Sequence, residues 1–100
     1  MAEIIDGPVM AEAVGVTSAG YLGGAETLRS LNVVVYPVEQ RAVVWAGLRD
    51  TSLDAQLAAV AAFAEVRECY LDELEVELRF GEPDEPTSDR ATAKAMELTR

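Results

Sequence analysis

Two β-rich runs separated by three residues constrain the fold of this chain most. Val33–Val38 (VVVYPV) and Ala42–Leu48 (AVVWAGL) are dominated by β-branched and aromatic residues, which favour strands. The connection Glu39–Arg41 is short enough for a tight turn between neighbouring antiparallel strands. Pro37 lacks a backbone N–H and therefore predicts a bulge or a sheet edge near the end of the first run. The sequence predicts a β-hairpin near its centre.

The residues before this hairpin predict a strand followed by a helix. Gly7-Pro8 separates an N-terminal arm, residues 1–8, from the apolar run Val9–Val16, which we expect to form the first strand. Thr17 or Ser18 would then cap a helix from about Ala19 to Leu31, because hydroxyls accept hydrogen bonds from free helix N–H groups. The glycines in this helix weaken it by roughly 1 kcal/mol each, which suggests close packing against a sheet or a frayed first turn.

A second helix follows the hairpin and carries two apolar stripes. Thr51 or Ser52 suits its N-cap, and Asp54 lies in the first turn, where the helix dipole favours an anion. The main stripe consists of Leu53, Leu57, Val60, Ala61 and Ala64, and the second of Ala59, Phe63, Val66 and Tyr70. With apolar residues on so much of its circumference, most of this helix should be covered.

The stretch Leu74–Phe80 alternates apolar and charged residues, which is typical of a half-exposed strand; an uninterrupted helix to Phe80 is the alternative. As a strand, it would direct Glu73, Glu75 and Glu77 to one open face. Together with Asp72, these carboxylates resemble a catalytic or Ca²⁺ cluster. A solvated face that protects the sheet from edge pairing is the better interpretation.

The last segment, residues 82–100, predicts an acidic linker and a short C-terminal helix or tail. The row EPDEPTSD holds two prolines and four acids and therefore cannot pack into a core. Thr87 or Ser88 could cap a final helix through Leu98, which would be marginal on its own. The folded domain is accordingly predicted to comprise residues 1–81.

The order strand, helix, strand, strand, helix, strand predicts an α+β fold. Two split β-α-β units of this kind form the ferredoxin-like βαββαβ sandwich, a four-stranded antiparallel sheet with both helices on one face. Each helical segment is long enough to cross back over such a sheet.

The row VGVTSAGYLGGAETLRSL resembles the loop and first helix of heavy-metal-associated domains, the small carriers of copper, zinc and mercury. In that family a Gly-Met-Thr-Cys-x-x-Cys loop opens the first helix. Gly15, Val16 and Thr17 match the start of the loop, while Ser18 and Tyr21 stand at the two cysteine positions. The resemblance covers about residues 14–63, including the hairpin from Val33 to Val44.

The replaced cysteines decide what the resemblance implies for function. A soft ion such as Cu(I) needs thiolate ligands, and neither a serine hydroxyl nor a phenol substitutes well. Cys69 is the only cysteine and lies outside the matched loop; we expect it to be a buried small apolar residue. We therefore assign no metal, cofactor or catalytic residue.

Composition narrows the classes of function further. The chain has 18 acidic and 8 basic residues, no histidine and a formal charge of −10. Direct binding of nucleic acid or of an anionic membrane is disfavoured, because both need Lys and Arg. Without histidine, no Ser-His-Asp or Cys-His arrangement can form, and we expect no enzyme. No window resembles a signal peptide or a membrane span, so a cytoplasmic location is expected.

These observations favour a non-catalytic protein–protein interaction or assembly module, with a protein partner that could be basic, or with further copies of the chain as a homo-oligomer. The candidate interaction residues are Tyr21, Trp45, Glu73, Glu75 and Glu77. Trp45 is expected to pack under a helix and becomes an interface anchor only if it faces outward. Two alternatives stay open: a metal or small-ligand carrier with an altered site using Met10, Tyr21 or Cys69, and an acidic decoy of a nucleic-acid-binding surface.

Overall fold

A computed structural model describes residues 6–83 and 91–98 of the chain and combines helices with one mixed β-sheet. The elements, in chain order, are α1 (Gly7–Leu22), α2 (Gly24–Thr27), β1 (Leu28–Tyr36), β2 (Arg41–Leu48), α3 (Leu53–Cys69), β3 (Glu75–Phe80) and β4 (Thr92–Ala95). The central hairpin, the helix after it and the strand that follows that helix are confirmed.

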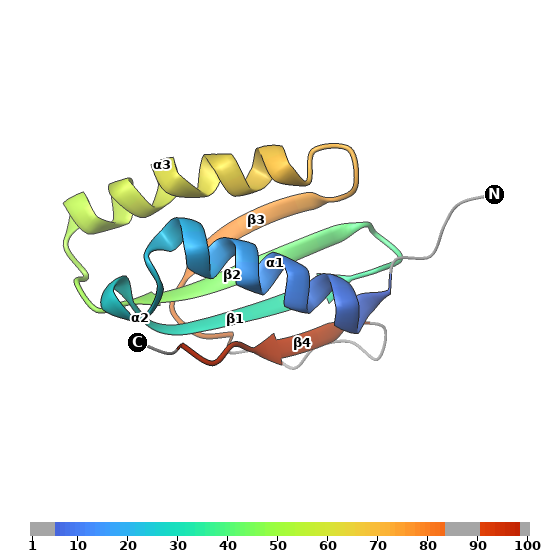
Figure 1. Cartoon of the computed structure of the whole chain (residues 1–100), viewed down its shortest axis with the longest axis horizontal. Coiled ribbons are helices and arrows are strands. Elements are labelled where there is room, and N and C mark those ends of the chain that lie inside the picture. Colours follow the sequence, from blue (N-terminus) through green and yellow to red (C-terminus); the bar gives the residue numbers. More distant parts are fainter. Residues whose placement is uncertain (1–5, 84–90, 99–100) are drawn as a thin grey trace.

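The sheet has the strand order β3-β2-β1-β4 (Figure 1). β1 is antiparallel both to β2 and to β4, whereas β3 is parallel to β2. Parallel neighbours need a crossover connection, and α3 provides it between β2 and β3.

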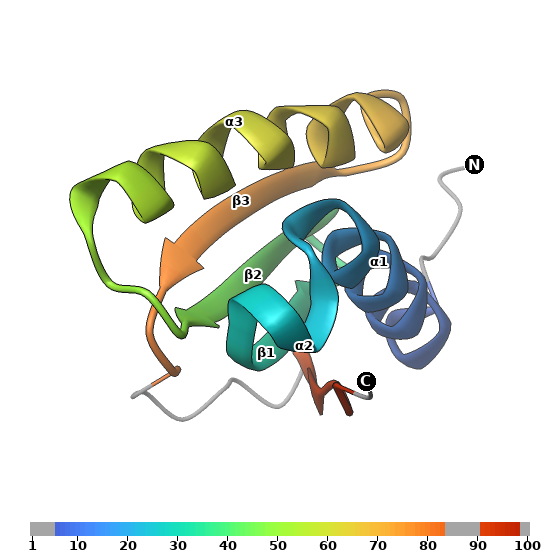
Figure 2. The same ribbon diagram turned by 60° about the vertical axis from the view of Figure 1, so that its left-hand side comes forward.

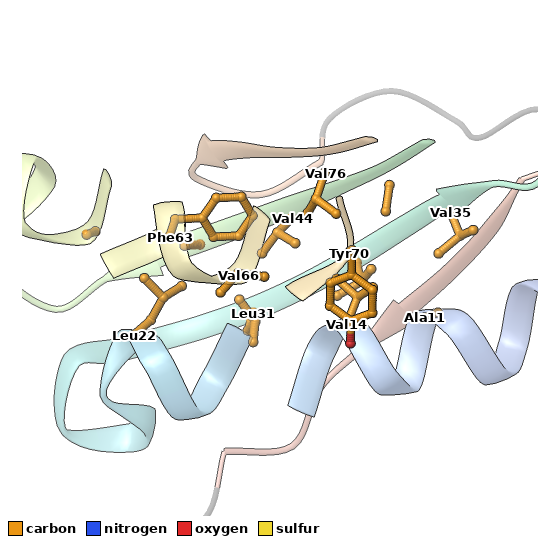
Figure 3. Close-up of a cluster of buried hydrophobic side chains, with 14 of the residues drawn as sticks. Ala11, Val14, Leu22, Leu31, Val35, Val44, Phe63, Val66, Tyr70 and Val76 are labelled. Atoms are coloured by element: carbon orange, nitrogen blue, oxygen red, sulfur yellow. The ribbon is translucent and has the colours of Figure 1, made fainter. Parts of the chain in front are cut away.

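Helices α1 and α3 cover the same face of the sheet, and within the described residues no helix covers the other face (Figure 2). The core lies between these two layers (Figure 3). Val33 and Val35 of β1, together with Val44 of β2, are completely buried beneath the helices. Phe63 from α3 is the largest of the fully buried side chains.

The first predicted strand, Val9–Val16, is wrong, because these residues belong to α1. Asp6 is the N-cap: its carboxylate accepts a hydrogen bond from the backbone N–H of Val9 at 3.2 Å. Pro8 lies in the first turn, where its missing N–H costs nothing and its fixed φ suits a helix. The Gly7-Pro8 pair therefore begins a helix.

The predicted helix from Ala19 to Leu31 is also wrong in its bounds, as is its predicted cap at Thr17 or Ser18. α1 ends at Gly23, whose φ of 95° is the left-handed conformation typical of a helix C-cap. Only the short α2 follows, and β1 begins already at Leu28.

The α+β class and the four-stranded sheet with its two long helices on one face are confirmed, but the antiparallel ferredoxin-like strand order is wrong. In a ferredoxin-like sheet the two strands joined by each crossover helix are separated by an inserted strand, so all neighbouring strands are antiparallel. Here the first apolar run is helical, and β4 pairs with the free edge of β1 instead. β3 then lies on the free side of β2.

The predicted C-terminal helix is wrong over the residues that form β4. The contact of this strand with α1 is close: a Cβ placed on Gly15 would overlap the side chain of Met96, and one on Gly7 that of Thr92. The sheet therefore extends beyond the predicted boundary at residue 81. Most of the predicted linker, residues 84–90, and most of the predicted N-terminal arm, residues 1–5, lie outside the described residues.

Candidate interaction surfaces

Helix α3 begins as its sequence predicts. The Ser52 hydroxyl accepts a hydrogen bond from the backbone N–H of Ala55 at 3.2 Å, and Asp54 lies in the first turn. Arg67 lies in the last turn, where a cation complements the carbonyl end of the helix. Its Nε also donates to the carbonyl oxygen of Val76 at 3.2 Å, which connects the end of α3 to strand β3.

The sheet-facing side of α3 corresponds to the second of the two predicted stripes. Ala59, Phe63 and Val66 are buried, and Tyr70, directly after the helix, is 8% exposed. We call this side the inner stripe.

The main predicted stripe faces solvent. Leu53, Leu57 and Val60 are 69%, 57% and 48% exposed, and Ala61 and Ala64 are exposed too. We call these five residues the outer stripe. Leu57 and Val66 differ by about two and a half helical turns, so the outer stripe lies on the opposite side of α3 from the core. The prediction that most of this helix is covered is wrong for the single chain.

The outer side of α1 is similar in character. Its exposed residues include Val9 at 63%, Val16 at 60% and Tyr21 at 48%, and Glu12 is the only charged residue in the helix. Among the described residues, eight large apolar side chains are exposed: three on α1, three on α3, and Val38 and Leu71 in connections. Exposed apolar area is thus concentrated on the helix layer of an otherwise acidic protein.

Polar contacts join the two helices between these outer sides. The hydroxyls of Thr17 on α1 and Tyr70 share a hydrogen bond of 3.0 Å. Tyr21, in the last turn of α1, meets the side chain of Cys69, and a hydrogen bond with Cys69 raises the pKa of Tyr21 above its ordinary value. The charge of Cys69, loss of water and the carboxylate of Glu65 raise this pKa further. Cys69 is exposed, so the expectation of a buried cysteine is wrong.

The helix-free face of the sheet presents aromatic and arginine side chains. Trp45 is half-buried and lies on this face, because its neighbours Val44 and Ala46 belong to the core on the other side. The guanidinium of Arg79 lies 5.8 Å from the Trp45 ring centroid, and that of Arg41 lies 4.8 Å from the Tyr36 ring. The expectation that Trp45 packs under a helix is therefore wrong.

The three glutamates predicted on one open strand face separate in the structure. Glu75 and Glu77 belong to β3 and pair in register with Arg41 and Val43 of β2, so they share the helix-free face. Glu77 forms an exposed ion pair with Arg79 at 2.8 Å, which has little effect on stability. Glu73 precedes the strand, in the turn after α3.

Of the residues considered for an altered metal site, Tyr21 and Cys69 meet, but Met10 lies apart from them. Ser18, at a cysteine position of the resembled loop, is a fully buried residue of α1, and its hydroxyl has no hydrogen-bond partner in the part of the chain that the structure describes. Met10 packs against the core, about three helical turns or roughly 16 Å from Tyr21 along α1. Within residues 6–83 and 91–98, no three His, Cys, Asp or Glu side chains are grouped so that they could hold a metal ion.

Comparisons with known proteins add no relative: no family model matches the chain, and neither a curated protein nor a solved structure matches it. The resemblance to heavy-metal-associated domains stays a prediction. None of the helices in the described part of the chain is long and apolar enough to cross a membrane.

The outer stripe is not among the interaction sites predicted from the sequence. The sequence predicts its five residues as an apolar stripe of a helix that is mostly covered. The second apolar stripe on the same helix could have indicated the exposed surface, because a helix in a two-layer fold contacts its sheet with one side only.

Proposed function

We propose that this chain is a non-catalytic protein–protein interaction module whose principal contact surface is the outer stripe of α3. The observation that carries the proposal is the exposure of Leu53, Leu57 and Val60 on the side of α3 away from the core. Contiguous exposed apolar surface in a water-soluble domain marks a contact site, whereas isolated exposed apolar residues are normal.

The charge distribution supports a protein partner. From Ala55 to Ala64 the helix carries no charged residue, although the chain has 18 acids. Asp54, Glu65 and Glu68 lie around the stripe on α3 and Arg67 is the only cation on this helix. An acidic border of this kind opposes binding to anionic lipid, which attracts Lys and Arg. It permits an apolar contact with another polypeptide.

The helix-free face is a weaker candidate for the principal contact. Two of its aliphatic residues, Val34 and Val43, are only 2% and 4% exposed. The cations of this face already stack on its aromatic rings. Trp45 and the pair Glu75 and Glu77 therefore remain proposed secondary contacts, and Tyr21 borders the helix layer.

Site-specific photocrosslinking tests the proposal. A photoreactive residue replaces Leu57 in the full chain, in the cells that produce it, and the covalent adduct is identified by mass spectrometry. The same residue at Val38, which is 66% exposed in the turn between β1 and β2, is the matched control. We expect a defined polypeptide adduct from position 57 and none of it from position 38.

The binding affinity of variants for the crosslinked partner then tests whether the adduct reflects a specific complex. With the purified partner, Leu57→Asp should weaken binding by about tenfold or more, because it removes a central apolar contact and introduces a charge. Val38→Asp should leave the affinity unchanged. Equal adducts at both positions, or binding of the wild-type chain to neutral phosphatidylcholine vesicles through Leu57 without any polypeptide adduct, would contradict the proposal.

A further inference from the structure

We infer that the free edge of β3 accepts an extended segment of the partner polypeptide as a fifth strand, and that this segment alternates apolar with basic residues. The inference rests on the proposed function and specifies how the partner is held beside the outer stripe. Among the described residues, β3 is the last strand on its side of the sheet, and α3 lies along it (Figures 1 and 2). A strand added here would contact α3 as well as β3.

The backbone of β3 has hydrogen-bonding groups that point away from the sheet. The N–H of Glu75 donates to the carbonyl oxygen of Gln40 at 2.9 Å, so the odd-numbered residues of β3 direct their backbone groups towards β2. The even-numbered residues Val76, Leu78 and Phe80 therefore direct their N–H and C=O groups to the free edge. No described strand pairs with them on this side. An unpaired edge of this kind can bind a further strand.

The outer stripe lies beside the same edge. The Nε of Arg67 donates to the carbonyl oxygen of Val76, one of the outward groups, so the side of α3 that carries Arg67 faces the edge. Counted at about 100° per residue, Arg67 lies about 40° around the helix from the buried Phe63. Val60 and Leu57 follow in the same direction, at about 60° and 120°. Alternate side chains of an added strand would therefore point towards the outer stripe.

A hollow of about 450 Å³ lies between the end of α3 and this edge. It is lined by Arg67, Leu71, Leu74, Glu75, Val76 and Glu77. Leu71 is 77% exposed, and Leu78, further along the strand, is only half-buried although it packs against the core. Apolar side chains of an added strand would cover both leucines, which the chain by itself leaves in contact with water.

Charge favours a basic segment. Residues 68–78 contain five acids and no lysine or arginine. Two of these acids, Glu75 and Glu77, lie on the helix-free face of β3, next to the positions that alternate residues of an added strand would occupy. Arg79 pairs with Glu77, whereas Glu75 has no salt bridge among the described residues. A lysine or arginine opposite Glu75 would form a favourable cross-strand pair.

The same charge opposes pairing of β3 with a second copy of the chain. Two copies of charge −10 repel each other, and the acids of both edges would be brought together. The opposite edge of the sheet is less suitable for a partner, because β4 has only four residues and short edge strands resist pairing. The partner segment is therefore expected at the six-residue edge of β3.

Backbone amide exchange, followed by NMR on the full chain, tests this edge. The probe is a peptide of about seven alternating lysine and valine residues, titrated to about 1 mM. In the free chain the N–H of Leu78 should exchange fast, while those of Glu77 and Arg79, which point towards β2, exchange slowly. At ten times the dissociation constant of the peptide, exchange at Leu78 should slow about tenfold, because only about one chain in eleven stays free.

The control peptide has the same composition, with its valines grouped together. It should bind at least about tenfold more weakly, since it cannot present its valines to one face of a strand. An unchanged exchange rate at Leu78 with about 1 mM of the alternating peptide would overturn the inference. Equal affinity of the two peptides would overturn it too.

Glu75→Lys tests the preference for a basic segment and leaves the core in place, because Glu75 is exposed. It should weaken binding of the lysine–valine peptide about fivefold and strengthen binding of a glutamate–valine peptide. Glu12→Lys makes the same change of net charge at an exposed position of α1 and should alter either affinity less than about twofold. Equal effects of the two substitutions would indicate general attraction to an acidic chain and would overturn the inference.

The two proposals fail in distinguishable ways. A polypeptide adduct at residue 57 whose purified complex leaves the exchange at Leu78 unchanged overturns strand addition and leaves the interaction function standing. The absence of any residue-57 adduct overturns both, because the added strand is placed beside the outer stripe.

Discussion

The inner and outer stripes of α3 are similar in sequence and opposite in their surroundings. Both consist of apolar residues at helical spacing, yet Phe63 and Val66 are fully buried while Leu57 and Val60 are largely exposed. The sheet selects the stripe with the phenylalanine, whose ring fills the space above the β-branched residues of the strands. This helix carries more apolar surface than its own domain buries, and the proposed contact through the outer stripe rests on that excess.

The largest expected effect is a difference in the free energy of unfolding between two truncations, one in the inner stripe and one in the outer stripe. Phe63→Ala leaves a cavity in the core and should lower the free energy of unfolding by about 3–5 kcal/mol. Leu57→Ala removes a side chain that is 57% exposed and should change it by less than about 1 kcal/mol. Urea denaturation at a concentration where the chain is monomeric measures both values.

If Leu57→Ala destabilises the monomer as much as Phe63→Ala does, the distinction between the two stripes disappears. If the unfolding free energy of both variants falls with urea concentration at a similar slope, neither substitution alters how much surface is exposed on unfolding.

An intermediate effect is expected where α1 and α3 meet. Tyr70→Phe removes the part-buried hydrogen bond with the Thr17 hydroxyl and should cost about 0.5–1.5 kcal/mol of unfolding free energy. A double-mutant cycle with Thr17→Ala isolates the pair, because each single variant removes the same contact. Additive effects of the two substitutions would show that the hydroxyls do not stabilise the junction of the helices.

The smallest effect is expected at the exposed border, where Tyr21 meets Cys69. Cys69→Ala removes the largest cause of the raised pKa, so the pKa of Tyr21 should fall towards its ordinary value. Alkaline absorbance titration of the phenols, with Tyr21→Phe to identify the residue among three tyrosines, measures this shift. An identical Tyr21 pKa in both chains would contradict the contact.

The sign of the associated stability change follows from the raised pKa. The contribution of Tyr21 to stability is complete below its unfolded-state pKa and is lost as pH rises through the folded-state pKa, because the unfolded chain releases this proton more easily. Wild type should therefore lose more stability at alkaline pH than Tyr21→Phe, in the range that begins near the ordinary tyrosine pKa.

The central part of the fold was predictable because its signals are local. The β-branched runs and the short turn define the hairpin β1–β2, and Ser52 followed by helical spacing defines α3. The alternation from Leu74 to Phe80 identified β3 for the same reason. In each case the preference of the residues agrees with the contacts they make in the fold.

The two flanking regions were not predictable, because tertiary pairing overrides local preference there. Val9–Val16 is rich in valine, but Asp6 and Pro8 begin a helix that buries Ala11 and Val14. Thr92–Ala95 contains alanine and lysine, which favour helices, and it becomes a strand only because the free edge of β1 accepts it. Because the secondary structure of these two segments is predicted wrongly, the predicted strand order is wrong too.

The candidate site was predicted only in part. Periodicity identified all five residues of the outer stripe, but periodicity alone does not say which of two stripes faces the sheet. Trp45 was placed on the wrong face for a similar reason, because alternation defines two faces of a strand and leaves open which one the helices cover.

The position of β4 has a consequence for the order in which the chain can assemble during synthesis. α1 leaves the ribosome before the other described elements, but Met96, the side chain that fills the space over Gly15, follows only after nearly all the rest of the described chain. Until then, part of the inward side of α1 has no neighbour, and contacts so distant in sequence slow folding.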